Sequence, residues 1–194
     1  MAIQNIAVLG AGQMGNGITQ VAAAAGYNVT MIDIQQEYVD KGLATIERSL
    51  GKLVSKERMS QEDADATLAR ISLSTDRADC ADCDLVVEAV PEIVDLKTSI
   101  FAELDSICKP ETILASNTSS ISISTIADAT NRPDKVIGMH FMNPVPIMKL
   151  VEVINGDKTS AQTNAAVIEA SQRMGKTALS CNDSPGFISN RILC

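Results

Sequence analysis

A glycine-rich junction near the N-terminus constrains the fold of this chain more than any other feature. Residues 3–9 (IQNIAVL) form an apolar run of strand length, and residues 14–25 carry an Ala-rich helical pattern. Between them lies the G-x-G-x-x-G spacing Gly10-Ala11-Gly12-Gln13-Met14-Gly15. The first glycine permits a tight turn, the second lets a pyrophosphate approach the backbone, and the third allows close packing of helix and strand. The N-terminus of the helix adds unpaired N–H groups that attract an anion. The junction therefore predicts a dinucleotide site, with a flavin or an ordinary glycine turn as alternatives.

Asp33 supports the dinucleotide interpretation. It follows the second strand pattern, residues 28–32, as the ribose-binding acid of such a site should. A carboxylate accepts hydrogen bonds from a free ribose hydroxyl and repels a 2′-phosphate, which favours NAD over NADP. NADP stays an alternative, because neighbouring residues can reshape such a pocket.

Strand and helix patterns alternate along the rest of the chain. Further strands are predicted at residues 71–73, 84–89, 112–115, 135–139 and 149–154. Further helices are predicted at residues 39–53, 61–69, 96–107, 121–129 and 161–174. This alternation predicts an α/β fold of the Rossmann type, a doubly wound and mainly parallel sheet. The last two strands lie too close together for a crossover helix, so we expect an antiparallel pair near the C-terminal edge.

Composition narrows the function classes. The 194 residues suit one domain, and 24 acidic against 16 basic residues give a net charge of −8. With no Trp, this balance argues against nucleic-acid binding. No charged leader precedes the first strand, and the apolar runs are shorter than a membrane span, so we expect a cytoplasmic protein without membrane association.

The cysteines predict neither a disulfide framework nor a metal site. Their number is odd, and the one C-x-x-C pair, Cys80 and Cys83, has no second pair to complete four zinc ligands. Acidic neighbours at Asp79, Asp82 and Asp84 disfavour a thiolate. We expect reduced cysteines in a loop.

His140 and Glu152 form a candidate catalytic pair. His140, the single histidine, ends one of the last two strands, and Glu152 lies inside the apolar run of the other. A buried carboxylate is costly unless it is paired, and the imidazole is its obvious partner if the strands are neighbours. A histidine held in this way is a general base, as oxidation of a secondary alcohol requires. From spacing alone, a structural histidine and an edge glutamate are an equally good interpretation.

Six motifs in order extend these observations to a family. They are residues 10–15 (GAGQMG), 84–92 (DLVVEAVPE), 116–120 (SNTSS), 140–144 (HFMNP), 148–153 (MKLVEV) and 184–191 (SPGFISNR). Together they resemble the N-terminal domain of the L-3-hydroxyacyl-CoA dehydrogenase family, and within it the bacterial 3-hydroxybutyryl-CoA dehydrogenases. The resemblance covers essentially the whole chain. It implies NAD-dependent interconversion of (S)-3-hydroxybutyryl-CoA and acetoacetyl-CoA, in fatty acid and butanoate metabolism.

The resemblance also implies roles for individual residues. His140 matches the catalytic base, Glu152 its orienting carboxylate, Ser119 a contact to substrate and nicotinamide, and Asn190 a contact to the substrate carbonyl. Ser49 and Lys56 match contacts to the CoA moiety. The implied cofactor contacts are Gly10, Ala11, Gly12, Gln13, Met14, Gly15, Asp33, Glu92, Lys97, Ser119 and Asn143.

Two features leave other functions open. Lys52, Lys56 and Arg58 concentrate positive charge that suits CoA phosphates, but a solvated helix face is the alternative. The resemblance assigns residues 1–183 to the NAD-binding domain and residues 184–194 to the start of a helix leading to an all-helical dimerisation domain absent from this chain. The rival functions are a dehydrogenase of free hydroxy acids and, for a truncated chain, a dinucleotide-binding module with little activity.

Overall fold

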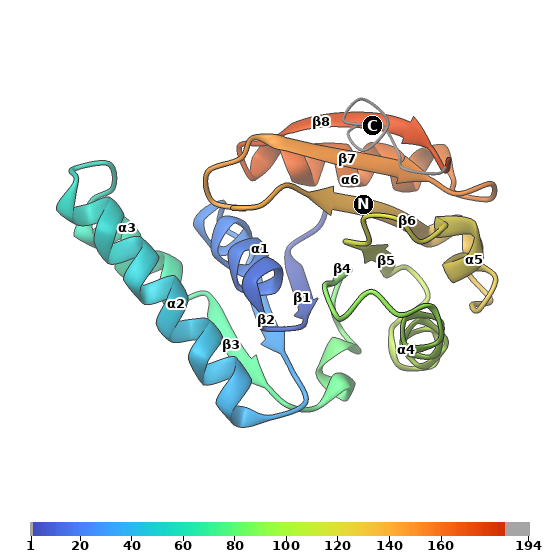
Figure 1. Ribbon diagram of the computed structural model, residues 1–194, viewed down its shortest axis with the longest axis horizontal. Coiled ribbons are helices and arrows are strands. Elements are labelled where there is room, and N and C mark those ends of the chain that lie inside the picture. Colours follow the sequence, from blue (N-terminus) through green and yellow to red (C-terminus); the bar gives the residue numbers. More distant parts are fainter. Residues whose placement is uncertain (1, 185–194) are drawn as a thin grey trace.

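The computed structural model describes residues 2–184, so Met1 and residues 185–194 lie outside the described part. Within that part, eight strands form one sheet in the order β3-β2-β1-β4-β5-β6-β7-β8 (Figure 1). The strands are β1 Asn5–Leu9, β2 Asn28–Ile32, β3 Ile71–Ser74, β4 Leu85–Glu88, β5 Ile113–Ser116, β6 Val136–Phe141, β7 Leu150–Asn155 and β8 Thr177–Asn182. The α-helices are α1 Gln13–Ala24, α2 Gln36–Ser55, α3 Gln61–Leu68, α4 Val94–Ile107, α5 Ile123–Ala127 and α6 Ala161–Arg173. Short 3₁₀ turns occur at η1 Arg77–Cys80 and η2 Pro133–Lys135.

The pairing of the strands confirms the predicted sheet. The six neighbouring strands β3, β2, β1, β4, β5 and β6 are all parallel. Strands β6 and β7 are antiparallel, and β8 is parallel to β7. The strand order reverses at β1, which lies between β2 and β4. In a doubly wound sheet, ligands bind outside the carboxyl ends of the strands at such a switch point. The glycine loop follows β1 and therefore lies there.

Apolar side chains cover both faces of the sheet. Along β1, Ile6 and Val8 pack into one core with residues of α1 and α6, while Ala7 and Leu9 pack into a second core with α4 and α5. Side chains alternate between the faces of a strand, so a strand covered on both faces must be apolar throughout. This is why residues 6–9 of β1, all of them buried, form an apolar run in the sequence.

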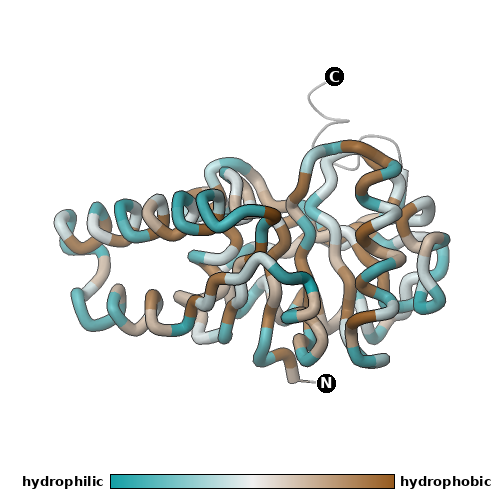
Figure 2. The backbone as a smooth tube through the Cα atoms, turned by 90° about the horizontal axis from the view of Figure 1, so that it is seen from below, coloured by the Kyte–Doolittle hydropathy of each residue, from teal (hydrophilic) through white to brown (hydrophobic). Residues whose placement is uncertain are grey.

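The helical pair α2–α3 extends beyond the sheet (Figures 1 and 2). Its own small core contains Val39, Ile46 and Leu50, with Leu43 and Leu53 packed against them, which confirms the predicted apolar face of the long helix. At Gly42 the helix comes close to the glycine loop, because a Cβ there would lie 3.0 Å from the carbonyl oxygen of Ala11. Helix α2 thus forms one wall beside the switch point.

The sequence interpretation missed β8, which pairs with β7 along all six of its residues. This strand lies at the edge of the sheet, and most of its side chains are exposed. Its sequence, TALSCN, consequently lacks the apolar signal by which the buried strands were found.

The expectation that the C-x-x-C cysteines are reduced and lie in a loop holds for Cys83, whereas Cys80 is free but ends the short 3₁₀ turn η1. Cys80 belongs to η1, and both Cys80 and Cys83 are buried in the core beside α4, near Cys108. Burial raises the pKa of Cys83 and Cys108 to about 11, so burial, more than the neighbouring acids, disfavours the thiolates. These cysteines are packing residues.

Among the described residues, no helix has both the length and the apolarity needed to cross a bilayer. The predicted boundary between residues 183 and 184 falls at the end of the described part, and the helix expected at 184–194 lies almost wholly outside it.

Candidate active site

Gly10 and Gly15 are required by the shape of the glycine loop, and Gly12 leaves one side of the loop open. Gly10 has φ +97°, and a Cβ on it would lie 2.6 Å from the carbonyl oxygen of Ala89. A Cβ on Gly15 would lie 1.7 Å from the carbonyl oxygen of Gly10, so no larger residue fits there. At Gly12, by contrast, no atom lies within 4 Å of the Cβ position. The open side of the loop at Gly12 lets an anion approach the N-terminus of α1.

Asp33 fastens this loop to the end of β2. One carboxylate oxygen accepts a hydrogen bond from the backbone N–H of Ala11 at 2.7 Å, and the other accepts from the N–H of Ile34 at 2.7 Å. A carboxylate has about four acceptor positions, so Asp33 can still bind ribose hydroxyls. The acid predicted to select the cofactor therefore also holds the loop that would bind the pyrophosphate.

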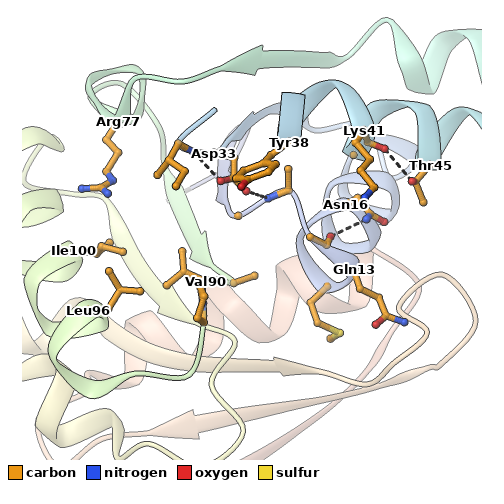
Figure 3. Close-up of a pocket in the computed structure, with 18 residues that line it drawn as sticks. Gln13, Asn16, Asp33, Tyr38, Lys41, Thr45, Arg77, Val90, Leu96 and Ile100 are labelled. Atoms are coloured by element: carbon orange, nitrogen blue, oxygen red, sulfur yellow. Dashed lines mark hydrogen bonds between the residues drawn. The ribbon is translucent and has the colours of Figure 1, made fainter. Parts of the chain in front are cut away.

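A cavity of about 740 Å³ opens beside Asp33 and the glycine loop (Figure 3). Its apolar wall includes Val90, Leu96 and Ile100, and Tyr38 and Lys41 of α2 line it as well. Figure 3 shows Arg77 and Lys41 on opposite sides of Asp33. The residues fit the adenosine and pyrophosphate part of NAD: an apolar slot, an acid for the ribose and an open helix N-terminus.

A second cavity, of about 450 Å³, continues the first. The two share Met14, Ala89 and Val90. The second cavity is also lined by Glu92, Asn117, Ser119, His140, Phe141, Met142 and Asn143. A dinucleotide bound with its adenosine beside Asp33 would thus extend past Met14 toward His140.

The structure brings His140 and Glu152 together. The antiparallel pairing of β6 and β7 places the two residues directly opposite each other. The imidazole Nδ1 lies 2.8 Å from a carboxylate oxygen of Glu152. Glu152 is fully buried, whereas His140, 9% exposed, lines the second cavity. The carboxylate favours the tautomer with a proton on Nδ1, which makes Nε2 the basic nitrogen.

Beside the second cavity lies a buried ion cluster that joins two predicted site residues, Lys97 and Glu92, to Glu88, which the sequence interpretation missed. The ammonium of Lys97, 1% exposed, donates to Glu88 at 2.5 Å and lies 3.3 Å from Glu92. The second oxygen of Glu88 accepts from the hydroxyl of Ser116 at 2.7 Å. Glu88 stands in an apolar strand, the same signal that drew attention to Glu152, and could have been found by it.

Glu92 connects this cluster to the loop that carries Ser119. Its carboxylate accepts from the backbone N–H groups of Ser119 at 2.9 Å and Ser120 at 3.2 Å, and from the hydroxyl of Thr118. Burial works against the charged form of Glu92, but the Thr118 hydroxyl and the Lys97 ammonium outweigh it and hold the pKa of this carboxyl below its usual range. Glu92 lines the second cavity, whereas Lys97, the other predicted cofactor contact of this cluster, is buried and lines neither cavity.

Asn143 links the two cavities from the loop between β6 and β7. Its side-chain oxygen accepts from the amide of Gln13 in the glycine loop, at 3.2 Å. The predicted cofactor residues of the N-terminal loop and of the region after His140 thus touch one another.

The remaining predicted site residues lie elsewhere. Ser49 is partly buried on α2, and Lys56 is exposed at its end; neither lines the two cavities described. Lys52, in the last turn of α2, and Arg58, between α2 and α3, are also exposed. Asn190 lies outside the described residues.

Comparison with known proteins decides the family. Residues 5–184 match the sequence profile described as "3-hydroxyacyl-CoA dehydrogenase, NAD binding domain". The chain belongs to the 3-hydroxyacyl-CoA dehydrogenase family. The predicted resemblance and the predicted cofactor, NAD, are thereby confirmed.

Individual members of the 3-hydroxyacyl-CoA dehydrogenase family are similar to nearly the whole chain. A "Probable 3-hydroxybutyryl-CoA dehydrogenase" of Deinococcus radiodurans is 55% identical over 186 residues, 96% of this chain and 66% of that protein. A protein of the same name from Bacillus subtilis is 49% identical and covers 100% of this chain and 67% of its own length. The crystal structure of (S)-3-hydroxybutyryl-CoA dehydrogenase from Ralstonia eutropha has a TM-score of 0.98 at 48% identity, over 100% of this chain and 68% of that one. The chain spans about two thirds of the length of these relatives.

Proposed function

We propose that this chain is the NAD-binding part of an enzyme that interconverts (S)-3-hydroxybutyryl-CoA and acetoacetyl-CoA. The observation that carries the proposal is the His140–Glu152 pair, 2.8 Å apart, in a cavity continuous with the dinucleotide cavity. A base beside the nicotinamide end of the cofactor site is what oxidation of an alcohol needs. The names of the relatives supply the substrate class.

The glycine loop and Asp33 would hold NAD, which would supply the hydride acceptor for oxidation at C3 of the substrate and the hydride donor for reduction. His140 takes the C3 hydroxyl proton at Nε2 during oxidation and returns it during reduction. Glu152 holds the ring by its Nδ1–H and stabilises the imidazolium that forms. Ser119 contacts the substrate and the nicotinamide, and Glu92 and Lys97 support its loop.

The CoA moiety accounts for the proposed roles of Ser49 and Lys56. CoA carries several phosphate charges, and Lys52, Lys56 and Arg58 supply cations at the end of α2 and just beyond it. Asn190 holds the substrate carbonyl. We place the full-length enzyme in the cytoplasm, in fatty acid and butanoate metabolism, as a homodimer.

The decisive experiment compares acetoacetyl-CoA with free acetoacetate as oxidants of NADH at equal concentration. We expect NADH oxidation with acetoacetyl-CoA and little with acetoacetate. Equal rates would favour the dehydrogenase of free hydroxy acids. NADH binding without oxidation by either compound would favour the dinucleotide-binding module.

Replacement of Asp33 tests the cofactor site separately. Asp33→Ala removes the ribose acceptor and the anchor of the Ala11 N–H, so we expect the Kd for NADH to rise about 10–100-fold. The Kd for acetoacetyl-CoA should change by less than about threefold. Fluorescence titration with NADH and calorimetry with acetoacetyl-CoA measure the two constants.

Asp33→Asn is the matched control, because it keeps an acceptor oxygen for Ala11 but removes the charge. Its loss of NADH affinity should be smaller than that of Asp33→Ala. Equal losses for NADH and acetoacetyl-CoA in Asp33→Ala would contradict the ribose role.

A further inference from the structure

Residues 142–148, the β6–β7 loop, form one wall of the cavity that contains His140. Met142 and Asn143 line that cavity directly. The rest of the loop turns away from it, and Pro144 accepts backbone hydrogen bonds from Ile147 at 3.0 Å and Met148 at 2.9 Å. Whatever fixes this turn also fixes the two residues that face the cavity.

A buried lysine holds the turn from outside the site. Lys176, between α6 and β8, is 8% exposed. Its ammonium donates to the carbonyl oxygen of Val145 at 2.5 Å and to that of Met148 at 2.7 Å. Among the residues that the structure describes, no carboxylate forms an ion pair with Lys176. The ammonium therefore has backbone carbonyls of the loop as its hydrogen-bond partners.

Burying the Lys176 ammonium costs desolvation free energy, which its hydrogen bonds to the loop must offset. Burial of the ammonium without a carboxylate lowers the pKa of Lys176. A hydrogen bond from a charged donor is stronger than one from a neutral donor, and one ammonium can serve both carbonyls. An apolar side chain of similar length would leave these carbonyls without that donor.

The turn is held from the opposite side by α1. Val145 is 2% exposed, and a Cβ on Gly17 of α1 would lie 2.8 Å from its Cβ. At the cavity end, Asn143 accepts the hydrogen bond from Gln13. The loop is thus clamped between Lys176 and the helix that begins at the glycine loop.

We propose that Lys176 is a positioning residue for the nicotinamide end of the cofactor site, acting through the Val145 and Met148 carbonyls to hold Met142 and Asn143 against the bound dinucleotide. This inference rests on the proposed function, in which the nicotinamide occupies the cavity lined by those two residues. Lys176 itself touches neither cavity. Its effect should therefore be confined to ligands that reach the nicotinamide end.

The test compares NADH with ADP-ribose, which has the adenosine and pyrophosphate but no nicotinamide. In Lys176→Met we expect the Kd for NADH to rise about tenfold and the Kd for ADP-ribose to stay within about twofold. The matched control is Lys149→Met, which removes an exposed lysine next to the same loop. It should leave both constants unchanged. NADH fluorescence and calorimetry give the values.

A second variant reaches the loop without touching Lys176. Gly17→Ala pushes on Val145 from α1, while alanine suits a helix better than glycine. It should reproduce the selective loss of NADH affinity, which tests the role of the loop. If Lys176→Met does not fold, Lys176→Gln, which keeps a neutral donor but removes the charge, takes its place with the same expected result.

The outcomes separate the two proposals. If the wild-type chain does not bind NADH, the proposed function fails and this inference with it. If the wild type binds NADH but the variants bind it equally well, or lose NADH and ADP-ribose affinity to the same extent, only the positioning role is overturned. An effect of Lys149→Met equal to that of Lys176→Met would overturn it as well.

Discussion

Replacement of His140 by Gln is expected to lower kcat for acetoacetyl-CoA reduction by about 10²–10⁴-fold. Glutamine fills similar space beside Glu152 but cannot exchange a proton with the substrate at neutral pH. The Kd for NADH should stay within about twofold, because the adenosine and pyrophosphate contacts lie in the other cavity. Steady-state kinetics of acetoacetyl-CoA reduction measure kcat, and fluorescence titration with NADH measures the Kd.

The companion variant is Glu152→Gln, which keeps the shape of the pair and removes its charge. We expect a smaller loss of kcat than in His140→Gln, because the base stays in place but loses the carboxylate that lies 2.8 Å from its Nδ1. Near-normal turnover in His140→Gln would contradict the assignment of the base.

Replacement of Lys97 by Met is expected to destabilise the fold by about 3–5 kcal/mol. Glu88 is fully buried, so without the ammonium its charge would have no compensating cation in the cluster. The free energy of unfolding, measured by urea titration, gives the effect.

Two further variants control for this prediction. The double variant Lys97→Met with Glu88→Gln removes both charges and should recover part of the loss, since removing one partner of a buried pair costs more than removing both. Lys158→Met breaks an exposed pair with Asp128 and should cost less than about 1 kcal/mol. A Lys97→Met protein as stable as the wild type would show that the cluster does not stabilise the fold.

The fold was predictable where burial leaves a periodic pattern. The apolar run ending at Leu9 and the spacing of Val39, Ile46 and Leu50 on α2 identify elements because their side chains enter a core. Edge strand β8 exposes most of its residues and so carries no such pattern. The burial of Cys80 and Cys83 has no local pattern either, because it comes from contacts with α4, made by residues distant in sequence.

The candidate site was predictable where the signal lies within one short stretch of sequence. The glycine loop is a local motif, and Glu152 is recognisable as a carboxylate within an apolar strand. What joins the parts is not local: the Asp33 contact to Ala11, the Glu92 contacts to the Ser119 loop and the Lys176 contacts to the β6–β7 loop all connect distant segments. The sequence singled out Asp33 by its position and Glu92 by the family resemblance, but it gave no sign of Lys176, and only the packing of the sheet shows what each of these side chains holds.

The placement of His140 and Glu152 in opposed positions of β6 and β7 has a consequence for evolution and engineering. Their separation is set by the register of two strands, while Met142 and Asn143, in the loop between those strands, line the second cavity. Substitutions in that loop can retune which ligand is accepted without redesigning the proton-transfer pair. A one-residue deletion inside either strand, by contrast, would turn one partner to the other face of the sheet and abolish the pair at once. Variation in ligand contacts is thus confined to the loop, while the register of β6 and β7 keeps the His140–Glu152 pair in place.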